Sequence, residues 1–299
     1  MAQIIKFPIK NRRLNSTTNT EVLTVPDYEA IWERACAEGE NGQEDGVLAL
    51  LNLMEEEPLS PENREVFSQF LFQQLFDAQV PLEKRESLAA AMAALFMGPE
   101  HNKILVPRLV LGTKEERMVA AIAIGFSGNH AALKPLKTAI CDADSDIQKA
   151  AAFGLSGLKN GELDGELIEI LLDHLELASS ADVRAAILVN LKLFARPSLE
   201  PVFLSHSYSA EPETQITALG GLLFFCSADG LERAVELLQS QRPAVRATAL
   251  SILERHGSRK DLERVFPILG DEDLRVRNLA RETMQRLREK GPNSVGWVS

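Results

Sequence analysis

The chain has 299 residues, 45% of them hydrophobic, so it can bury a large core as one domain or two. Its formal net charge of −11 argues against general affinity for nucleic acid, because that affinity comes mainly from Lys and Arg side chains that neutralise phosphates. Only 6% of the residues are aromatic, which favours helices packed through small and branched aliphatic side chains.

The cysteines indicate a reducing compartment. Cys36, Cys141 and Cys226 are far apart and show no CxxC spacing, so we expect neither a disulfide framework nor a zinc site, but three small core residues. No run of 18 apolar residues occurs, so no membrane span is predicted. The expected localisation is the cytoplasm.

The first segment, residues 1–26, is predicted to be a flexible basic tail. It contains no acidic residue before Glu21 and lacks the apolar segment of a secretory signal. The alternatives are a docking motif, for which IIKFPIKNRRL is suited, and an organellar targeting segment. Its four cations are Lys6, Lys10, Arg12 and Arg13.

Residues 27–80 are predicted to form divergent helical repeats or a cap. The stretches DYEAIWERACAEG, EDGVLALLNLMEE and PENREVFSQFLFQQLFDAQ each have the apolar spacing of an amphipathic helix. This region carries thirteen acidic residues against two arginines, whereas residues 242–290 carry twelve basic residues against eight acidic ones. Such opposite ends could steer separate partners or favour head-to-tail homo-oligomers, or they are ordinary solvated helix faces.

A repeat dominates residues 81–290. Related segments begin at Lys84, Glu116, Ile147, Val183, Thr214, Val245 and Val276, at intervals of 32, 31, 36, 31, 31 and 31 residues. One insertion near residues 159–165 explains the long interval. A second match, DGLERAVELL from Asp229 and KDLERVFPIL from Lys260, repeats after the same 31 residues. Each unit is therefore predicted to be a first helix, a turn often rich in Asp, and a second helix.

The second helix of each unit has one clear buried stripe. Counting each segment's first residue as zero, positions plus four and plus eight are small or aliphatic, as Ala151 and Leu155 show. Position plus one is Arg or Gln in every copy. Asp144, Asp182 and Asp273 lie at or just before the helix starts, where they suit N-caps and the positive end of the helix dipole.

The best copies, CDADSDIQKAAAFGL and GDEDLRVRNLA, resemble the HEAT repeat family, in particular its short bilin-lyase-type form of about 31 residues. This resemblance implies an all-α, right-handed α-α superhelix, a HEAT-like α-solenoid of about seven to eight helical pairs. It also implies a binding surface, and hence a non-enzymatic protein-protein interaction scaffold or adaptor.

Some proteins of this family are enzymes with recognisable site residues. Deoxyhypusine hydroxylase-like members hold iron with His-Glu pairs, but none of the five histidines here precedes Glu. Phycobilin lyases have Tyr and Trp in their second helices, and this chain lacks both residue types in the second helices of its clear repeats. A lyase-like or cofactor-maturation role is therefore only the alternative to the scaffold function. His130 and His256 are expected to cap helix ends. We predict no catalytic residue, metal or cofactor.

The predicted binding surface is an apolar concave groove. The solvent side of each second helix lies near plus two, plus six and plus nine, and these positions are apolar in the middle repeats. The expected partner is an amphipathic helix or extended peptide of another protein; the alternative is that curvature or the next layer buries these side chains. The candidate residues are Met118, Ile122, Phe126, Phe153, Val189, Ile216 and Leu223.

The last repeat offers a second surface, because it is rich in arginine. The expected electrostatic patch consists of Arg275, Arg277, Arg281, Arg286 and Arg288, and the C-terminal tail is residues 291–299 with Trp297. In the middle of the array, TQITALGGLLFFC carries no charge and two adjacent glycines, Gly220 and Gly221, which we expect to permit close helix contact.

Overall fold

The computed structural model describes residues 61–98, 101–178 and 180–290. All regular structure within these ranges is helical. The expectations for residues 1–60 and 291–299, including Cys36 as a core residue, lie outside the described residues.

The described helices form seven pairs, in agreement with the predicted all-α solenoid. The second helices are the seven segments that the repeat predicts: α4 (Leu82–Phe96), α6 (Lys114–Phe126), α8 (Ser145–Gly157), α10 (Ala181–Leu193), α12 (Pro212–Leu222), α14 (Pro243–His256) and α16 (Leu274–Glu289). The first helices are α3 (Pro61–Gln74), α5 (Asn102–Leu111), α7 (Leu133–Ala139), α9 (Asp164–Leu177), α11 (Glu200–His206), α13 (Ala228–Leu237) and α15 (Leu262–Val265). The 3₁₀ turns η2 (His130–Ala132), η3 (Pro197–Leu199), η4 (Arg259–Asp261) and η5 (Phe266–Gly270) extend the short first helices.

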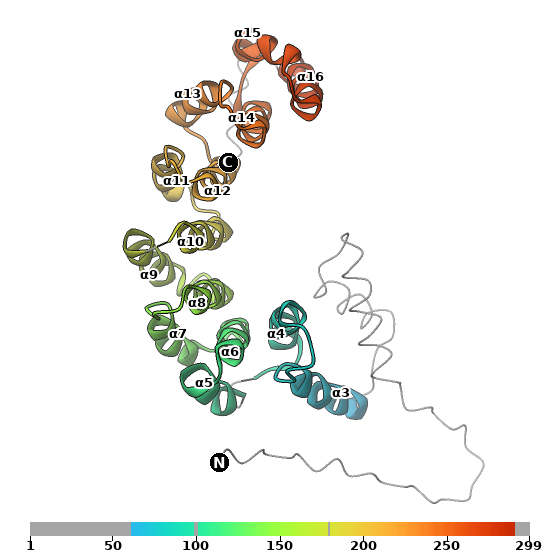
Figure 1. Cartoon of the computed structure of the whole chain (residues 1–299), viewed down its shortest axis with the longest axis vertical. Coiled ribbons are helices and arrows are strands. Elements are labelled where there is room, and N and C mark those ends of the chain that lie inside the picture. The colour runs from blue at the N-terminus through green and yellow to red at the C-terminus, as the bar shows by residue number, and fades with distance from the viewer. Residues whose placement is uncertain (1–60, 99–100, 179, 291–299) are drawn as a thin grey trace, which may run out of the picture.

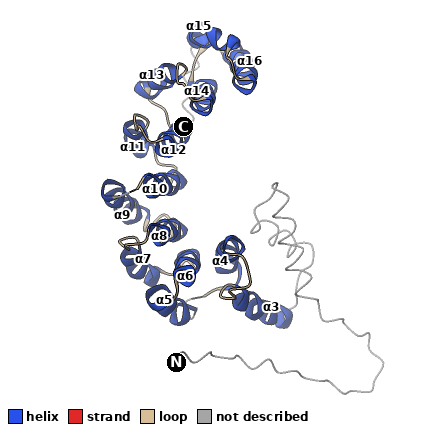
Figure 2. Cartoon of the chain, viewed as in Figure 1, coloured by secondary structure: helices blue, strands red, loops and turns tan. Residues whose placement is uncertain are grey.

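The pairs stack into a curved array with two layers (Figure 1). Each second helix contacts the next one along the chain, from α4 to α16, and these helices line the inner side of the curve. The first helices from α5 to α15 lie on the outer side, and Figure 2 shows that only loops join the two layers. The buried core runs along the whole array between these layers.

Side-chain caps fix where several second helices begin. Asp144 accepts a hydrogen bond from the amide of Asp146, and Asp273 accepts from the amides of Arg275 and Val276, as the sequence predicts. Asp182 lies in the first turn of α10 instead, because Ser180 provides that cap. Thr113 and Glu116 form a capping box at the start of α6.

Small residues let adjacent inner helices approach closely. A Cβ atom on Gly125 of α6 would overlap the backbone of Gly154 on α8, and a Cβ atom on Gly154 would overlap the carbonyl oxygen of Ala121. Both positions therefore require glycine because backbone meets backbone there. The rigid inner layer depends on such contacts.

The two glycines of α12 differ from each other. A Cβ atom on Gly221 would overlap the buried ring of Phe203 on α11, so Gly221 admits the outer helix. A Cβ atom on Gly220 would meet only Nζ of Lys192, at 4.0 Å. Gly221 thus permits close helix contact, as expected, whereas Gly220 leaves open space on the inner face.

Candidate functional site

The inner face of the middle repeats exposes apolar side chains. Since α10 contacts α9 behind it and α8 and α12 on its flanks, its remaining side faces the inside of the curve. The exposed fractions are 36% for Phe153, 42% for Val189, 45% for Leu193 and 43% for Phe224. We call these four residues the inner strip; they lie on or directly after the consecutive helices α8, α10 and α12.

Five of the seven predicted groove residues lie on or beside the inner strip. Phe153 and Val189 belong to it, while Phe126, Ile216 and Leu223 are half-buried at its margin. The rings of Phe126 and Phe153 pack with their centroids 4.9 Å apart. The sequence therefore located the apolar face of the middle repeats but not its full extent.

Met118 and Ile122 are buried, with exposed fractions of only 9% and 4%, so the expectation that they line an open groove is wrong. Both lie on α6, which packs between α4 and α8. Glu86 of α4 lies within electrostatic range of Asp146 and Lys149 on α8, so the two flanking helices close over the inner side of α6. Burial, followed by the charge of Asp146, raises the pKa of Glu86. The curvature of the array at this end hides both side chains.

Leu193 and Phe224 were missed by the sequence reasoning. Both occupy position plus ten of their segments. Leu193 ends α10 four residues after Val189 and so lies on the same helix face, while Phe224 lies in the turn directly after the C-cap residue of α12. Position plus ten had not been included among the solvent-facing positions. Its apolar occupants in consecutive repeats were the signal that could have found them.

Two cations border the inner strip. Lys192 extends from α10 across α12, where it occupies the space above Gly220, and neither a hydrogen bond nor an ion pair is found for its ammonium group among the described residues. Arg255, on α14, lies with its guanidinium carbon 5.8 Å from the ring centroid of Phe224. Glu254, the residue before Arg255, is paired with Arg286 at 3.7 Å.

Exposed apolar residues on the outer layer lie on separated helices. Val110 and Leu111 end α5 and Leu177 ends α9, but the helix between them, α7, is followed by the buried Ile140. Exposed apolar side chains on one helix are common on protein surfaces, whereas apolar surface shared by neighbouring helices often marks a binding site. The inner strip is the contiguous set in the middle repeats.

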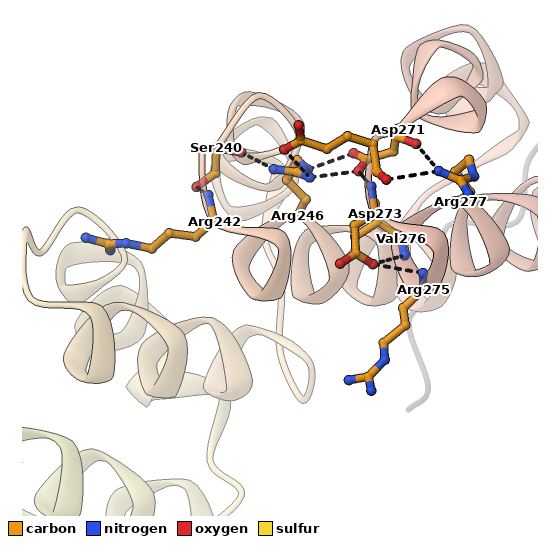
Figure 3. Close-up of polar contacts among 9 residues, drawn as sticks. Ser240, Arg242, Arg246, Asp271, Asp273, Arg275, Val276 and Arg277 are labelled. Carbon is orange, nitrogen blue, oxygen red and sulfur yellow. Dashed lines mark hydrogen bonds and ion pairs between the residues drawn. The ribbon is translucent and has the colours of Figure 1, made fainter.

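The recurring Arg or Gln at plus one joins one repeat to the next as a clamp at several places, whereas Gln148 and Arg277 bond carbonyls of their own turns. Figure 3 shows the best example: Nε and Nη2 of Arg246 donate to Oδ2 and Oδ1 of Asp271 in the next repeat, each at 2.7 Å. Nη1 of Arg246 also donates to the carbonyl oxygen of Ser240 at 2.8 Å. Both side chains of the ion pair are almost fully buried. This arginine therefore joins two repeats and is unavailable to a ligand.

The same clamp recurs along the array. Arg117 pairs with Asp142 and Arg184 with Glu211, each in the turn of the following repeat. Gln215 stands where no carboxylate follows: its Nε2 donates to the carbonyl oxygen of Ser207, and its Oε1 accepts from Arg242 of the next turn. At Gln215, the exchange of Arg for Gln thus accompanies a change from an acid to a base in the neighbouring turn.

The expected C-terminal arginine patch is divided between two sides of α16. Arg277 donates to the backbone carbonyls of Asp271 and Glu272, and Arg281 donates to Asn278. Arg286 pairs with Glu254, while Arg275 and Arg288 are exposed. At 100° per residue, Arg275 and Arg286 lie on one flank of the buried stripe and the other three on the opposite flank. The five arginines do not form one contiguous surface.

The cysteines and histidines have local roles. Cys141 is exposed in the turn after α7, so the expectation that it is a core residue is wrong. Its Sγ lies 3.1 Å from Nε2 of His174, whose Nδ1 donates to the carbonyl oxygen of Ile170. Cys226 is partly buried, and this burial, with the charge of Glu200, raises the pKa of its thiol to about 12.

The two histidines expected to cap helix ends bond across repeats instead. His256 ends α14, but its Nε2 donates to the carbonyl oxygen of Leu223 after α12, at 2.9 Å. Nε2 of His130 lies 2.8 Å from Nδ2 of Asn160. Burial lowers the pKa of His256, in keeping with a neutral ring. Within the described ranges there is no group of three potential metal-ligating side chains. None of the described helices is both long and apolar enough to cross a membrane.

Comparison with known families supports the prediction of HEAT-like repeats. The family model for HEAT repeats matches residues 197–285, which include the helices from α11 to α15 and most of α16. The segment from 197 to 285 is thus similar to HEAT repeats. The resemblance seen in the sequence is therefore confirmed, and the same paired helices continue the HEAT-like array back to α4. Curated protein sequences give no match to the chain.

Solved structures of helical solenoids are similar to this chain. One is Kap95p, whose binding induces the switch loops of RanGDP to adopt the GTP-bound conformation; it is 15% identical with a TM-score of 0.52 over 87% of this chain. The similar region is 39% of the length of Kap95p. An engineered protein is 20% identical with a TM-score of 0.46, over 63% of this chain and 97% of its own. At these identities the likeness concerns the fold.

Proposed function

We propose that this protein is a non-enzymatic scaffold or adaptor that binds a segment of another protein through the inner strip. The observation that carries the proposal is contiguity: Phe153, Val189, Leu193 and Phe224 are exposed on neighbouring helices of one rigid layer. Burying such side chains against a partner removes apolar surface from water, which favours association. The partner segment is an amphipathic helix or an extended peptide, both of which can place apolar side chains along such a surface.

The rigidity of the inner layer supports this role. The glycine contacts between α6 and α8 and the buried clamp between Arg246 and Asp271 hold successive helices in fixed positions. A surface that is already ordered loses little conformational freedom on binding, so more of the contact energy appears as affinity. The exposed thiol of Cys141 fits the proposed cytoplasmic location, where thiols stay reduced.

The test is affinity purification from the native host with a strip variant, Val189→Asp plus Phe224→Asp. Each substitution places a carboxylate where a partner's apolar side chain would lie, so we expect recovery of the specific partners to fall about tenfold or more. Quantitative mass spectrometry measures the recovery. Circular dichroism and thermal melting check that the variant folds.

A matched control is available on the outer layer. Leu111→Asp plus Leu177→Asp also introduces two carboxylates at exposed apolar positions, but on α5 and α9. This control should recover partners as the wild type does. Equal recovery with all three proteins would contradict the inner strip as the binding surface.

A further inference from the structure

We propose that the segment bound by the inner strip is an acidic amphipathic helix, with carboxylates along the edge that faces Lys192 and Arg255. This inference rests on the proposed function and adds the charge and size of the partner. The inference is based on two cations, Lys192 beside Gly220 and Arg255 beside Phe224.

The ammonium group of Lys192 lies over apolar surface. Its Nζ stands above Gly220, where a side chain on α12 would otherwise lie, and it extends from the same face of α10 as Val189. No described carboxylate pairs with it. Glu211 and Asp164, the acids of the neighbouring turns that form ion pairs, pair with Arg184 and Arg196 instead. A carboxylate from a bound segment could therefore pair with Lys192 without displacing an existing ion pair.

Arg255 extends the same edge by one more repeat. It stands at plus ten of α14, where α10 has Leu193 and α12 has Phe224, and its guanidinium group lies beside the Phe224 ring. The exposed acids of α10 and α12, Asp182 and Glu213, lie at the helix starts, away from this edge, while Glu254, which precedes Arg255 on α14, is paired with Arg286. The strip is thus apolar in the centre and basic along the edge formed by the helix ends. An acidic partner complements this arrangement and a basic one does not.

The dimensions favour a helix of definite length. From α8 to α14 there are three spacings between packed helices, each about 8–10 Å, which give about 24–30 Å. A helix that crosses them at 1.5 Å per residue has about 16–20 residues. One face of such a helix can contact Phe153, Val189 and Phe224 in turn, because side chains at intervals of three and four residues share a face.

The probe is a fluorescein-labelled 18-residue amphipathic peptide with Leu and Phe on one face and Glu on the other. The matched probe has Lys at every Glu position. Fluorescence anisotropy with the full chain at about 0.15 M salt, where the Debye length is about 8 Å, measures mainly local charge. We expect the acidic peptide to bind about tenfold more tightly or better, although the net charge of −11 would by itself favour the basic one.

Charge reversal provides the decisive variant. Lys192→Glu plus Arg255→Glu should invert the order, so that the basic peptide binds more tightly. Lys137→Glu plus Arg259→Glu, at exposed cations on α7 and η4, should leave the order unchanged. Val189→Asp should weaken binding of whichever peptide is preferred, because it disturbs the apolar centre. Melting temperatures check that the variants fold.

The outcomes separate this inference from the proposed function. If the basic peptide binds equally well or better and Val189→Asp still weakens it, the acidic partner is wrong and the inner strip stands. If the acidic peptide binds but Val189→Asp has no effect, the peptide lies elsewhere and the inference is wrong. Binding of neither peptide at about 100 µM protein also overturns the acidic helix, and the co-purification experiment then decides the strip by itself.

Discussion

Gly220 and Gly221 are adjacent on α12, yet their surroundings predict opposite effects of the same substitution. Gly221→Ala would place a methyl group in the buried ring of Phe203 and should destabilise the protein by about 1–3 kcal/mol through overpacking. Gly220→Ala meets only Lys192 at an ordinary contact distance and should stabilise it by about 0.5–1 kcal/mol, because glycine in a helix has more freedom to lose on folding.

Urea unfolding of the two variants and the wild type measures this difference in the free energy of unfolding. The two variants serve as controls for each other, since they add the same methyl group to neighbouring helix positions. Equal changes in the two would show that the contacts of Phe203 and Lys192 do not determine the outcome.

At the scale of single residues, the sequence identified which positions repeat but not what each one touches. Gln215 and Arg246 occupy the same repeat position, and the pattern presented them as equivalents. Their partners come from the following repeat, about 25–27 residues further on. Pairing across repeats depends on how two turns meet, which local propensity does not specify.

At the scale of elements, the contact between repeats predicts that the Gln–Arg pair of Gln215 and Arg242 can be replaced by an Arg–Glu ion pair. Gln215→Arg should destabilise the array by about 1 kcal/mol or more, because it places a buried guanidinium beside Arg242. Adding Arg242→Glu should restore stability, since Arg242 stands three residues before its segment's first residue, as Glu211 does in the pair with Arg184.

A double-mutant cycle measures this exchange through the free energies of unfolding. We expect a favourable coupling of about 1–3 kcal/mol between the two substitutions. Arg242→Glu alone is the control, and it should have a small effect because Arg242 is exposed. Additive effects of the two substitutions would show that the turn acid and the helix arginine do not act as a pair.

The element scale also shows where the helix pattern succeeded. All seven second helices lie where the repeat placed them, because a buried stripe at plus four and plus eight leaves little choice of helix face. The error at Met118 and Ile122 arose from the neighbours of α6 and not from its own pattern. Those residues had the correct phase for the inner side, but α4 and α8 close over that side.

At the scale of the whole molecule, each repeat contacts mainly its neighbours, and the ion pair that joins the last two described repeats is sensitive to acid. Arg246 donates to the Asp271 carboxylate and so lowers its pKa, and Asp271 belongs to the turn before α16. Because the pKa is lower in the folded state than the value of about 3.9 expected for an unfolded Asp, this pair stabilises the fold above about pH 4. The stabilisation is lost as the pH falls through the folded-state pKa.

Asp271→Asn tests this dependence. At pH 7 it should lower the free energy of unfolding by about 1–3 kcal/mol, because the buried Arg246 loses its close carboxylate and keeps only the exposed Glu272, at 3.5 Å. The difference from the wild type should shrink as the pH falls below about 4, where Asp271 of the unfolded chain takes up a proton, and it should vanish below the lower folded-state pKa. Urea unfolding from pH 3 to 7 measures it, and hydrogen exchange should show that the amides of α16 open first. A difference that stays constant with pH would exclude this ion pair as the cause.

The last described helix, α16, differs from the inner helices on the side that would face a further repeat. At plus five, the inner repeats have buried residues such as Leu188 and Leu250, which face the next helix, whereas α16 has the exposed Arg281 there. α16 is the last helix of the described residues, and a polar face there suits a repeat at the end of an array, where no further helix packs. The arginines of α16 are therefore explained largely by their position in the array, and the inner strip remains the better binding surface.

The sequence alone determined the helix pairs, their spacing and the apolar phase of the second helices, because these follow from a period of 31 residues and from the side-chain spacing of a single helix. The tertiary structure decided which apolar residues remain exposed, since exposure depends on the curvature that buries Met118 and Ile122 and leaves Val189 and Phe224 open. It also decided the position of Lys192 above Gly220, because that contact joins two repeats. Burial and charge pairing on the inner face are properties of neighbouring helices together, which no single repeat encodes.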